Sequence, residues 1–361
     1  MKILVVTPRY AISGVPLAQA RFAAALAERG HDVTFMVGNC DADLTVPAAP
    51  GVTTLVLGAR QVRGMIAPLV RHLRRAQPEV VFSAEDHLNC IVLAAALLAG
   101  SKARISGSSR VTPFDTYSSK PFNKRWVLKQ AMRALAPRAQ ALTCVSQDMV
   151  AQYRTLFPRM GHVCVYNIVD SPAARARMGE PVEDPWFADG LPPPIVAAGS
   201  LAPWKGFADL IRAIPLVPDA RLLILGEGPE RGALEALVAG LGLAERVRLP
   251  GRVDNPLRYF ARARVSALSS HVEGMPNVLV EAMMCGCTPV ATDCPTGPRE
   301  LLQGGRYGYL AKVGDPESIA AALREALARP IAPEMLAEAV QPFEQTRVIR
   351  RHFELLGLAE H

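Results

Sequence analysis

Residues 1–38 read MKILVVTPRYAISGVPLAQARFAAALAERGHDVTFMVG. Lys2–Thr7 is a short, nearly unbroken apolar run, which is typical of a buried strand in a parallel sheet. After a turn rich in small residues, Leu17–Arg29 has an amphipathic helical pattern that ends before Gly30, a good C-cap residue. Asp32–Val37 then repeats the strand pattern. This order of strand, helix and strand predicts a right-handed parallel crossover, the unit of doubly wound α/β folds.

The same alternation continues along the first half of the chain. Further strand patterns occupy residues 53–57, 80–83, 103–107, 141–145 and 162–166, with helical patterns between them. We therefore predict a first Rossmann-like domain over residues 1–170.

A second series begins after a proline-rich stretch. Residues 171–194 hold six prolines and little periodicity, as expected of a linker or an edge excursion. Strand patterns then fall at 195–199, 221–225, 247–249, 265–269 and 288–291. We predict a second Rossmann-like domain over residues 171–342, and we expect the amphipathic C-terminal segment, about 343–361, to join the first domain. The fold class is α/β, with ligands between the carboxyl ends of two sheets.

Composition limits the function classes. The chain has 361 residues, of which 50% are hydrophobic and 20% are charged, so it is globular and long enough for two domains. The net charge of +7 is uneven: residues 1–175 hold 21 basic and 10 acidic side chains, whereas residues 176–361 hold 19 and 23. A basic face can meet nucleic acid, an anionic membrane or a phosphorylated small molecule, or it can simply be solvated.

Cysteine usage and apolar runs bear on location. The seven cysteines form no C-x-x-C pair and have no matching histidine cluster, which argues against zinc and favours free thiols in a reducing compartment. The chain begins directly with a strand pattern, so we expect no signal peptide. The longest apolar stretch, Leu88–Gly100, is too short to cross a bilayer. We expect a cytoplasmic protein, with a peripheral position on the inner face of the cell membrane as one option.

The most specific chemistry lies in His271–Gly286, which reads HVEGMPNVLVEAMMCG. Two carboxylates, Glu273 and Glu281, stand eight positions apart, and a helix is expected to begin near Asn277. Eight residues make a little over two helical turns, so both carboxylates can face one cleft. Backbone amides at the start of a helix suit a phosphate group. Two ordinary charges on a surface loop and helix remain the alternative for these residues alone.

This stretch, with its continuation Thr288–Glu300, closely resembles the E-x7-E region of glycosyltransferase family 4. It is similar in particular to bacterial members that extend polysaccharides or lipid-linked oligosaccharides. The resemblance implies the GT-B fold, in which two doubly wound Rossmann-like domains enclose an interdomain cleft. It also implies a retaining sugar transfer from a nucleotide donor, and we expect that donor to be UDP-linked.

Three further segments agree with the family pattern. Gly199–Gly206 resembles the family loop whose lysine, here Lys205, meets the donor diphosphate, and Ser200 replaces the usual arginine. Leu225–Arg231 resembles a G-x-G-P turn, and Pro250–Asp254 resembles the loop that reads the nucleotide base. Plain turns between strands and helices are the alternative for the last two segments.

The resemblance thus implies roles for individual residues. Glu273 and Lys205 are the expected catalytic residues, with Glu273 near the sugar and Glu281 on the ribose hydroxyls. The expected donor-binding residues are Gly14, Ser200, Gly226, Arg252, Val253, Gly274, Met275, Pro276, Asn277, Val278 and Glu281. The family histidine of the first domain has no direct match, so the acceptor-side candidates are His87, Ser108 and Arg110, with Ser109 as another option.

No cofactor and no metal are expected. Asp41-Ala-Asp43 imitates the D-x-D metal motif of the other large glycosyltransferase fold, but it follows a strand in a polar loop and is interpreted as a turn. The expected partners are a nucleotide sugar and a glycan or lipid-diphosphate-linked acceptor, and no nucleic acid. A GT-B sugar-nucleotide epimerase and a catalytically silent glycan- or lipid-binding member are the alternative functions.

Two basic segments bear on a membrane surface. Arg60–Arg75 and Lys120–Arg138 both combine basic residues with apolar ones, and the second includes Phe122 and Trp126. Such faces suit an anionic membrane surface. A helix that packs by its apolar side and exposes its basic side is the alternative, chiefly for the first segment.

Overall fold

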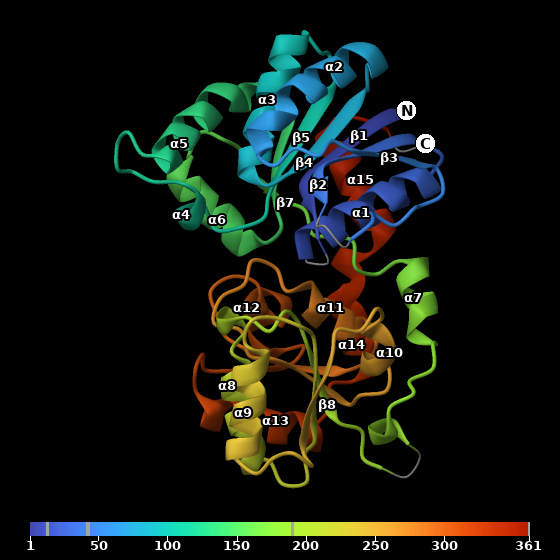
Figure 1. Cartoon of the computed structure of the whole chain (residues 1–361), viewed down its shortest axis with the longest axis vertical. Coiled ribbons are helices and arrows are strands. Elements are labelled where there is room, and N and C mark those ends of the chain that lie inside the picture. Colours follow the sequence, from blue (N-terminus) through green and yellow to red (C-terminus); the bar gives the residue numbers. More distant parts are fainter. Residues whose placement is uncertain (12–13, 41–43, 189–190, 360–361) are drawn as a thin grey trace. The chain divides into compact units, whose positions relative to one another are not determined.

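The computed structural model describes residues 1–11, 14–40, 44–188 and 191–359. The chain divides into two compact units: unit 1 comprises Met1–Ile168 and Gln345–His361, and unit 2 comprises Val169–Glu344. Figure 1 shows that each unit has its own sheet with helices packed around it. The prediction of two doubly wound α/β domains is confirmed.

Unit 1 contains a seven-stranded sheet in the order β3-β2-β1-β4-β5-β6-β7, and every pairing is parallel. Its strands are β1 (Lys2–Tyr10), β2 (Asp32–Cys40), β3 (Val52–Val56), β4 (Val80–Ala84), β5 (Arg104–Ser109), β6 (Ala141–Cys144) and β7 (Val163–Cys164). Its longer helices are α1 (Gly14–Glu28), α2 (Ile66–Ala76), α3 (Asp86–Ala99), α5 (Lys124–Leu135), α6 (Gln147–Leu156) and α15 (Gln345–Leu355), and α4 (Pro113–Thr116) is a single turn. The order reverses between β1 and β4.

The core of unit 1 explains why its first strand and its last helix belong together. Side chains of β1, including Ile3 and Val5, pack in the same buried cluster as Phe22 of α1 and Ile349 and Phe353 of α15. The apolar side of α15, which has no strand partner along the chain, is thereby buried in unit 1. Burial of a large apolar side chain contributes roughly 1.5–3 kcal/mol.

Unit 2 contains a six-stranded parallel sheet in the order β10-β9-β8-β11-β12-β13. Its strands are β8 (Ile195–Ala198), β9 (Leu222–Leu225), β10 (Val247–Gly251), β11 (Val265–Leu268), β12 (Thr288–Thr292) and β13 (Tyr309–Ala311). Its helices are α7 (Pro172–Met178), α8 (Phe207–Ala213), α9 (Arg231–Gly240), α10 (Leu257–Phe260), α11 (Asn277–Met284), α12 (Pro298–Leu301), α13 (Pro316–Ala328) and α14 (Pro333–Val340). The order reverses between β8 and β11.

Two parts of unit 2 differ from the expectations. The proline-rich stretch 171–194 contains α7, whose N-cap Ser171 accepts a hydrogen bond from the Ala174 amide. Prolines at the first helical position are compatible with a helix, because the amide they lack has no helical partner there. After β12 the structure continues with β13 and three helices that the periodicity did not indicate. β13 is three residues long, which is too short for a recognisable alternation.

Candidate active site

The predicted catalytic pair lies where the strand order of unit 2 reverses. Lys205 ends η4 (Pro203–Lys205), shortly after β8, and Glu273 lies in the loop between β11 and α11. β8 and β11 are neighbours, and both loops leave the carboxyl ends of their strands. In open α/β sheets this edge is the usual place for ligands.

Lys205 and Glu273 form an ion pair. The Lys205 Nζ atom lies 2.6 Å from Glu273 Oε1, and the side chains are only 18% and 10% exposed. The Ser270 hydroxyl donates to the same oxygen at 2.6 Å, and the Ser269 hydroxyl donates to the Lys205 carbonyl at 2.9 Å. Charge-assisted hydrogen bonds of this kind are stronger and shorter than neutral ones. The loop thus holds both charged groups in fixed positions.

Sequence reasoning missed both serines. Their only signal is that two hydroxyl residues follow a buried strand directly, at an edge where side chains converge. Ser269 and Ser270 are 2% and 0% exposed, so their role is to orient the pair rather than to bind solvent.

The backbone around Glu273 is fixed as well. Its amide donates to the Pro295 carbonyl at 3.3 Å, and the Thr296 hydroxyl donates to its carbonyl. Burial raises the pKa of the Cys294 thiol to about 12, and the negative charge of Glu273 is the second cause. The loop after β12 therefore holds the Glu273 loop in place.

Glycines allow the neighbouring loops to pack backbone to backbone. A Cβ atom on Gly226 would lie 1.8 Å from the Gly199 carbonyl oxygen, and one on Gly228 would lie 2.4 Å from the Leu201 carbonyl oxygen. Any side chain at these positions would displace the loop that carries Lys205. Ser200, in that same loop, is exposed.

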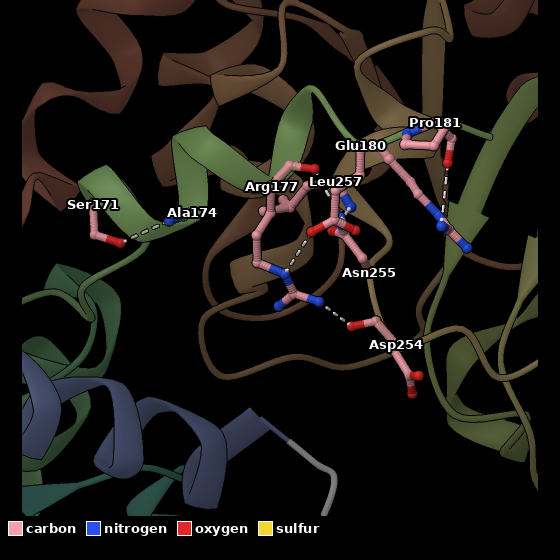
Figure 2. A network of polar contacts seen from close by, with 9 residues as sticks. Ser171, Ala174, Arg177, Glu180, Pro181, Asp254, Asn255 and Leu257 are labelled. Carbon is pink, nitrogen blue, oxygen red and sulfur yellow. Dashed lines mark hydrogen bonds and ion pairs between the residues drawn. The ribbon is translucent and has the colours of Figure 1, made fainter. Parts of the chain in front are cut away.

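The loop after β10 contains the two residues predicted to lie near the nucleotide base. Arg252 is exposed and Val253 is half-buried against an apolar cluster. Figure 2 shows how α7 holds this loop: Arg177 donates to the Asp254 carbonyl at 2.6 Å, and the Asn255 amide donates to the Arg177 carbonyl at 2.7 Å.

The Asn255 side chain is the centre of that network. It is 2% exposed, its amide nitrogen also donates to Glu180 at 2.8 Å, and its oxygen accepts from the Leu257 amide at 3.1 Å. One buried amide therefore joins α7, the loop after β10 and the first turn of α10.

α11 follows the Glu273 loop. Gly274, Met275 and Pro276 lead into the helix, which begins at Asn277, and Val278 is half-buried on its first turn. Glu281 lies further along, 8% exposed, and its charge adds to the burial that raises the pKa of the Cys285 thiol to about 12. The two carboxylates of the motif thus have different surroundings: Glu273 pairs with a lysine, and Glu281 is buried within its helix.

The first-domain candidates lie on three elements of unit 1. Gly14 opens α1, and His87 is exposed on the first turn of α3. Ser108, on β5, is buried, and Arg110, just beyond β5, donates a hydrogen bond to Asn167. Ser13 and the stretch 41–43 that carries Asp41 and Asp43 lie outside the described residues.

Two acidic residues beside His87 were not singled out from the sequence. Glu85 follows β4 at the point where the strand order of unit 1 reverses, and its φ of 80° is unusual for a residue other than glycine. Burial raises the pKa of the Glu85 carboxyl, although Arg110 acts in the opposite direction. Asp86 is buried and accepts hydrogen bonds from Ser109 at 2.8 Å and Tyr153 at 2.5 Å. Backbone strain of this kind is often found at functional sites.

Two kinds of feature are absent from the described residues. No group of three or more His, Cys, Asp and Glu side chains in the described ranges could hold a metal ion. None of the helices in the same ranges is both long and apolar enough to cross a membrane.

Two family models match the chain. The model described as glycosyl transferase 4-like domain matches residues 13–167, and the model described as glycosyl transferases group 1 matches residues 192–329. The two matches fall on the sheets of unit 1 and unit 2, respectively.

Curated relatives and solved structures agree with these models. An N-acetylgalactosamine-N,N'-diacetylbacillosaminyl-diphospho-undecaprenol 4-alpha-N-acetylgalactosaminyltransferase of Campylobacter jejuni is 33% identical over 66% of this chain and 64% of its own length, slightly less than two thirds. The lipopolysaccharide core biosynthesis glycosyltransferase LpsD of Rhizobium meliloti is 31% identical over 55% of this chain and 56% of its own. Anabaena HepE in complex with UDP-glucose has a TM-score of 0.74 at 20% identity, covering 99% of both chains.

Proposed function

We propose that this chain, which belongs to the glycosyltransferases similar to family 4, is a retaining enzyme that moves a sugar from a UDP-linked donor to a glycan or lipid-linked glycan. This reaction would contribute to the synthesis of cell-surface polysaccharides. The observation that carries the proposal is the half-buried ion pair of Lys205 and Glu273 at the strand-order reversal of unit 2. Two relatives support it: the Campylobacter protein is named as a glycosyltransferase for a diphospho-undecaprenol-linked substrate, and the Rhizobium protein as a glycosyltransferase of lipopolysaccharide core biosynthesis.

The pair suits a leaving diphosphate. In the transition state of sugar transfer, negative charge develops on the departing phosphate, and a fixed cation stabilises it without reorganisation. Lys205 is such a cation, since Glu273 and the Ser269 contact already fix its position. The amides at the start of α11 add a second positive end for the same anion.

Glu273 then has a second task. When the diphosphate takes up part of the Lys205 charge, the carboxylate is able to stabilise positive charge that develops on the sugar carbon. For a retaining transfer on one face of the sugar, the leaving phosphate accepts the proton of the acceptor hydroxyl. Glu281 accepts hydrogen bonds from the ribose hydroxyls, because a carboxylate matches a vicinal diol. In unit 1, the side chains that contact the acceptor substrate in this proposal are His87, Ser108 and Arg110.

The test is a donor screen that measures released nucleotide, with glycan and lipid-linked acceptors, in the presence of a metal chelator. We expect one UDP-sugar to release UDP faster when the acceptor is present, and we expect the rate to persist in the chelator. Lys205→Ala should lower that rate about 100-fold or more. Lys312→Ala, which removes the other lysine of unit 2, is the matched control and should leave it unchanged.

Other outcomes separate the alternatives. Interconversion of the donor to its epimer without an acceptor would identify an epimerase. Binding of glycan or lipid with no turnover of any donor would identify a silent binding protein. Activity that disappears in chelator and returns with magnesium or manganese would contradict metal independence and would direct attention to Asp41 and Asp43.

A further inference from the structure

Unit 1 contains a small polar cavity whose lining includes the acceptor-side candidates Ser108 and Arg110, and no step of the proposed reaction is assigned to it. It lies between the sheet and two helices, α1 and α15, and its polar lining comes from Gln19, Ser83, Ser106, Arg110, Asn167 and His352. Its volume is about 20 Å³, slightly more than the roughly 10–15 Å³ that one water molecule needs by this measure. A sugar or a nucleotide does not fit in such a space.

Three buried polar atoms on this lining have no hydrogen-bond partner in the described part of the chain. They are the Ser106 hydroxyl on β5, Nε of Arg110 just beyond β5, and Nδ1 of His352 on α15. Ser106 and His352 are 2% and 8% exposed, and Arg110 is half-buried as a residue although its Nε atom is buried. A buried polar atom without a hydrogen-bond partner destabilises the folded chain, so three around one cavity point to a ligand within it.

The lining has a positive charge with no anion in contact. Burial lowers the pKa of the Arg110 guanidinium to about 10, so it stays protonated at neutral pH. It donates a hydrogen bond to the neutral Asn167, and no carboxylate of the described residues forms an ion pair with it. The Glu85 charge opposes the effect of burial on this pKa, without an ion pair between the two side chains among the described residues. Burial, helped by Arg110, lowers the pKa of His352 to about 3, which keeps that ring neutral.

We propose that this cavity binds a single monoatomic anion of the chloride class. The guanidinium Nε–H, the Ser106 hydroxyl and the His352 ring, in the tautomer with hydrogen on Nδ1, supply three donors from two elements. An anion accepts from all three and also offsets the buried charge, whereas a water molecule satisfies the hydrogen bonds alone. The bound ion joins the end of β5 to α15 and so stabilises unit 1.

The first test locates the ion. Crystals of the whole chain are soaked in sodium bromide, and anomalous scattering is measured at the bromine edge. We expect a peak beside Arg110 Nε in the wild-type protein and its loss in Ser106→Ala. Thr143→Val is the matched control, because Thr143 on the neighbouring strand β6 also has an unpartnered buried hydroxyl but does not line the cavity. The control should keep the peak.

The second test measures stability at constant ionic strength, with chloride replaced by gluconate. At a chloride concentration four times the dissociation constant, binding favours folded unit 1 about fivefold, which should raise its Tm by about 2–4 °C. Ser106→Ala should need about tenfold more chloride for the same rise, and Thr143→Val should behave like wild type. Equal Tm values in chloride and gluconate, or the absence of a bromide peak beside Arg110, would overturn the proposal and leave a water-filled cavity.

Discussion

The two carboxylates at the unit 2 site make different contacts, which their spacing in the sequence does not reveal. Glu273 shares its carboxylate between Lys205 and Ser270, and Glu281 is buried on α11 beside Cys285. The pattern of two carboxylates eight positions apart predicts that both matter. It cannot tell which one contacts the lysine, because that depends on loops from three other strands.

Glu273→Gln should reduce turnover far more than nucleotide affinity. The amide keeps the shape but loses the charge that faces Lys205, and the site can no longer stabilise positive charge on the sugar. We expect kcat to fall about 100-fold or more while the Kd for UDP changes less than about threefold. Ser270→Ala keeps the ion pair and loses one hydrogen bond, so its kcat should lie between those of wild type and Glu273→Gln. A Glu273→Gln enzyme with a near-normal rate would remove Glu273 from the chemistry.

Glu281→Ala should act in the opposite way, on nucleotide binding. A buried diol that loses its acceptor costs about 1–3 kcal/mol, so the affinity for UDP should fall about five- to 150-fold, as measured by titration calorimetry. Glu235→Ala, an exposed glutamate on α9, is the control. Unchanged UDP affinity in Glu281→Ala would show that this carboxylate does not hold the ribose.

At the scale of elements, predictability followed length and apolar content. Long runs such as β1 and the helix over Arg231–Gly240 were predictable, because several periods of the pattern lie within them. β13 has three residues, and α7 lies in a stretch whose prolines indicated a linker. Glu85, whose φ is 80°, donates its amide to the Ser108 carbonyl on β5, a contact distant in sequence that no local pattern encodes.

α7 is joined to the rest of unit 2 through the buried side-chain amide of Asn255. Because Asn255 joins α7 to the loop that carries Arg252 and Val253, Asn255→Ala should loosen that loop by removing the side-chain bonds to the Arg177 carbonyl and to Glu180. We expect UDP affinity to fall about three- to tenfold, with loss of about 1–2 kcal/mol in unit 2 stability. Arg258→Ala, which removes a single more exposed bond to Pro181, should change UDP affinity less. Equal UDP affinity in wild type and Asn255→Ala would mean that the loop does not contact the nucleotide.

α15 should make unit 1 sensitive to acid. The pKa of His352 is lowered to about 3 in the folded chain, against 6.5 for an ordinary histidine. Between these values the unfolded chain binds a proton that the folded chain does not, so stability is complete above pH 6.5 and falls as the pH decreases toward 3. At pH 5.5 the loss relative to pH 7.5 is about 1.4 kcal/mol.

Urea unfolding of the unit 1 transition at these two pH values measures that loss. His352→Phe, which can keep the ring contacts with Phe22 and Phe82, should reduce the total pH difference by that amount, and His87→Phe at an exposed position should not. Burial also lowers the pKa of His31, His72 and His162, so a smaller pH difference should remain. A His352→Phe protein with the same pH difference as wild type would assign the acid sensitivity to other groups.

At the scale of the whole molecule, charge is divided between the two units. Unit 1 contains 23 basic and 11 acidic residues, a balance of +12, and unit 2 contains 17 and 22, a balance of −5. The exposed part of the unit 1 charge includes Lys120, Lys124 and Arg125, close in sequence to Phe122, which is 89% exposed and 5.5 Å from the Trp126 ring.

The structure refines which residues can form this basic surface. Lys129 is only 7% exposed, so it belongs to the packed side of α5 rather than to the solvent side. Arg138 donates to the Ser101 and Ala103 carbonyls, which holds it against unit 1. Phe114 and Val127, each 54% exposed, add apolar area beside the remaining basic residues. We define the basic aromatic surface as Phe114, Lys120, Phe122, Lys124, Arg125, Trp126 and Val127.

This surface should bind anionic membranes, where a lipid-linked acceptor would be found. Each basic residue near such a membrane contributes about 1 kcal/mol, and exposed aromatic rings enter the interface. In co-sedimentation with liposomes, wild-type protein should bind vesicles that contain phosphatidylglycerol, ignore vesicles of phosphatidylcholine, and dissociate as salt rises. Changing Lys120, Lys124 and Arg125 to Glu should abolish binding, and Phe122→Ser should weaken it.

The control carries the same charge change on unit 2. Arg262, Arg264 and Lys312 are exposed there, and changing all three to Glu alters the net charge of the chain equally while leaving the basic aromatic surface intact. If total charge drives attachment, both triple variants lose binding to the same degree. If the basic aromatic surface drives it, only the unit 1 variant does. Wild-type protein that does not bind anionic vesicles at low salt would remove the physical basis for a membrane-bound acceptor. It would not remove the basis for sugar transfer, because the two residues proposed to act on the donor, Lys205 and Glu273, lie in unit 2.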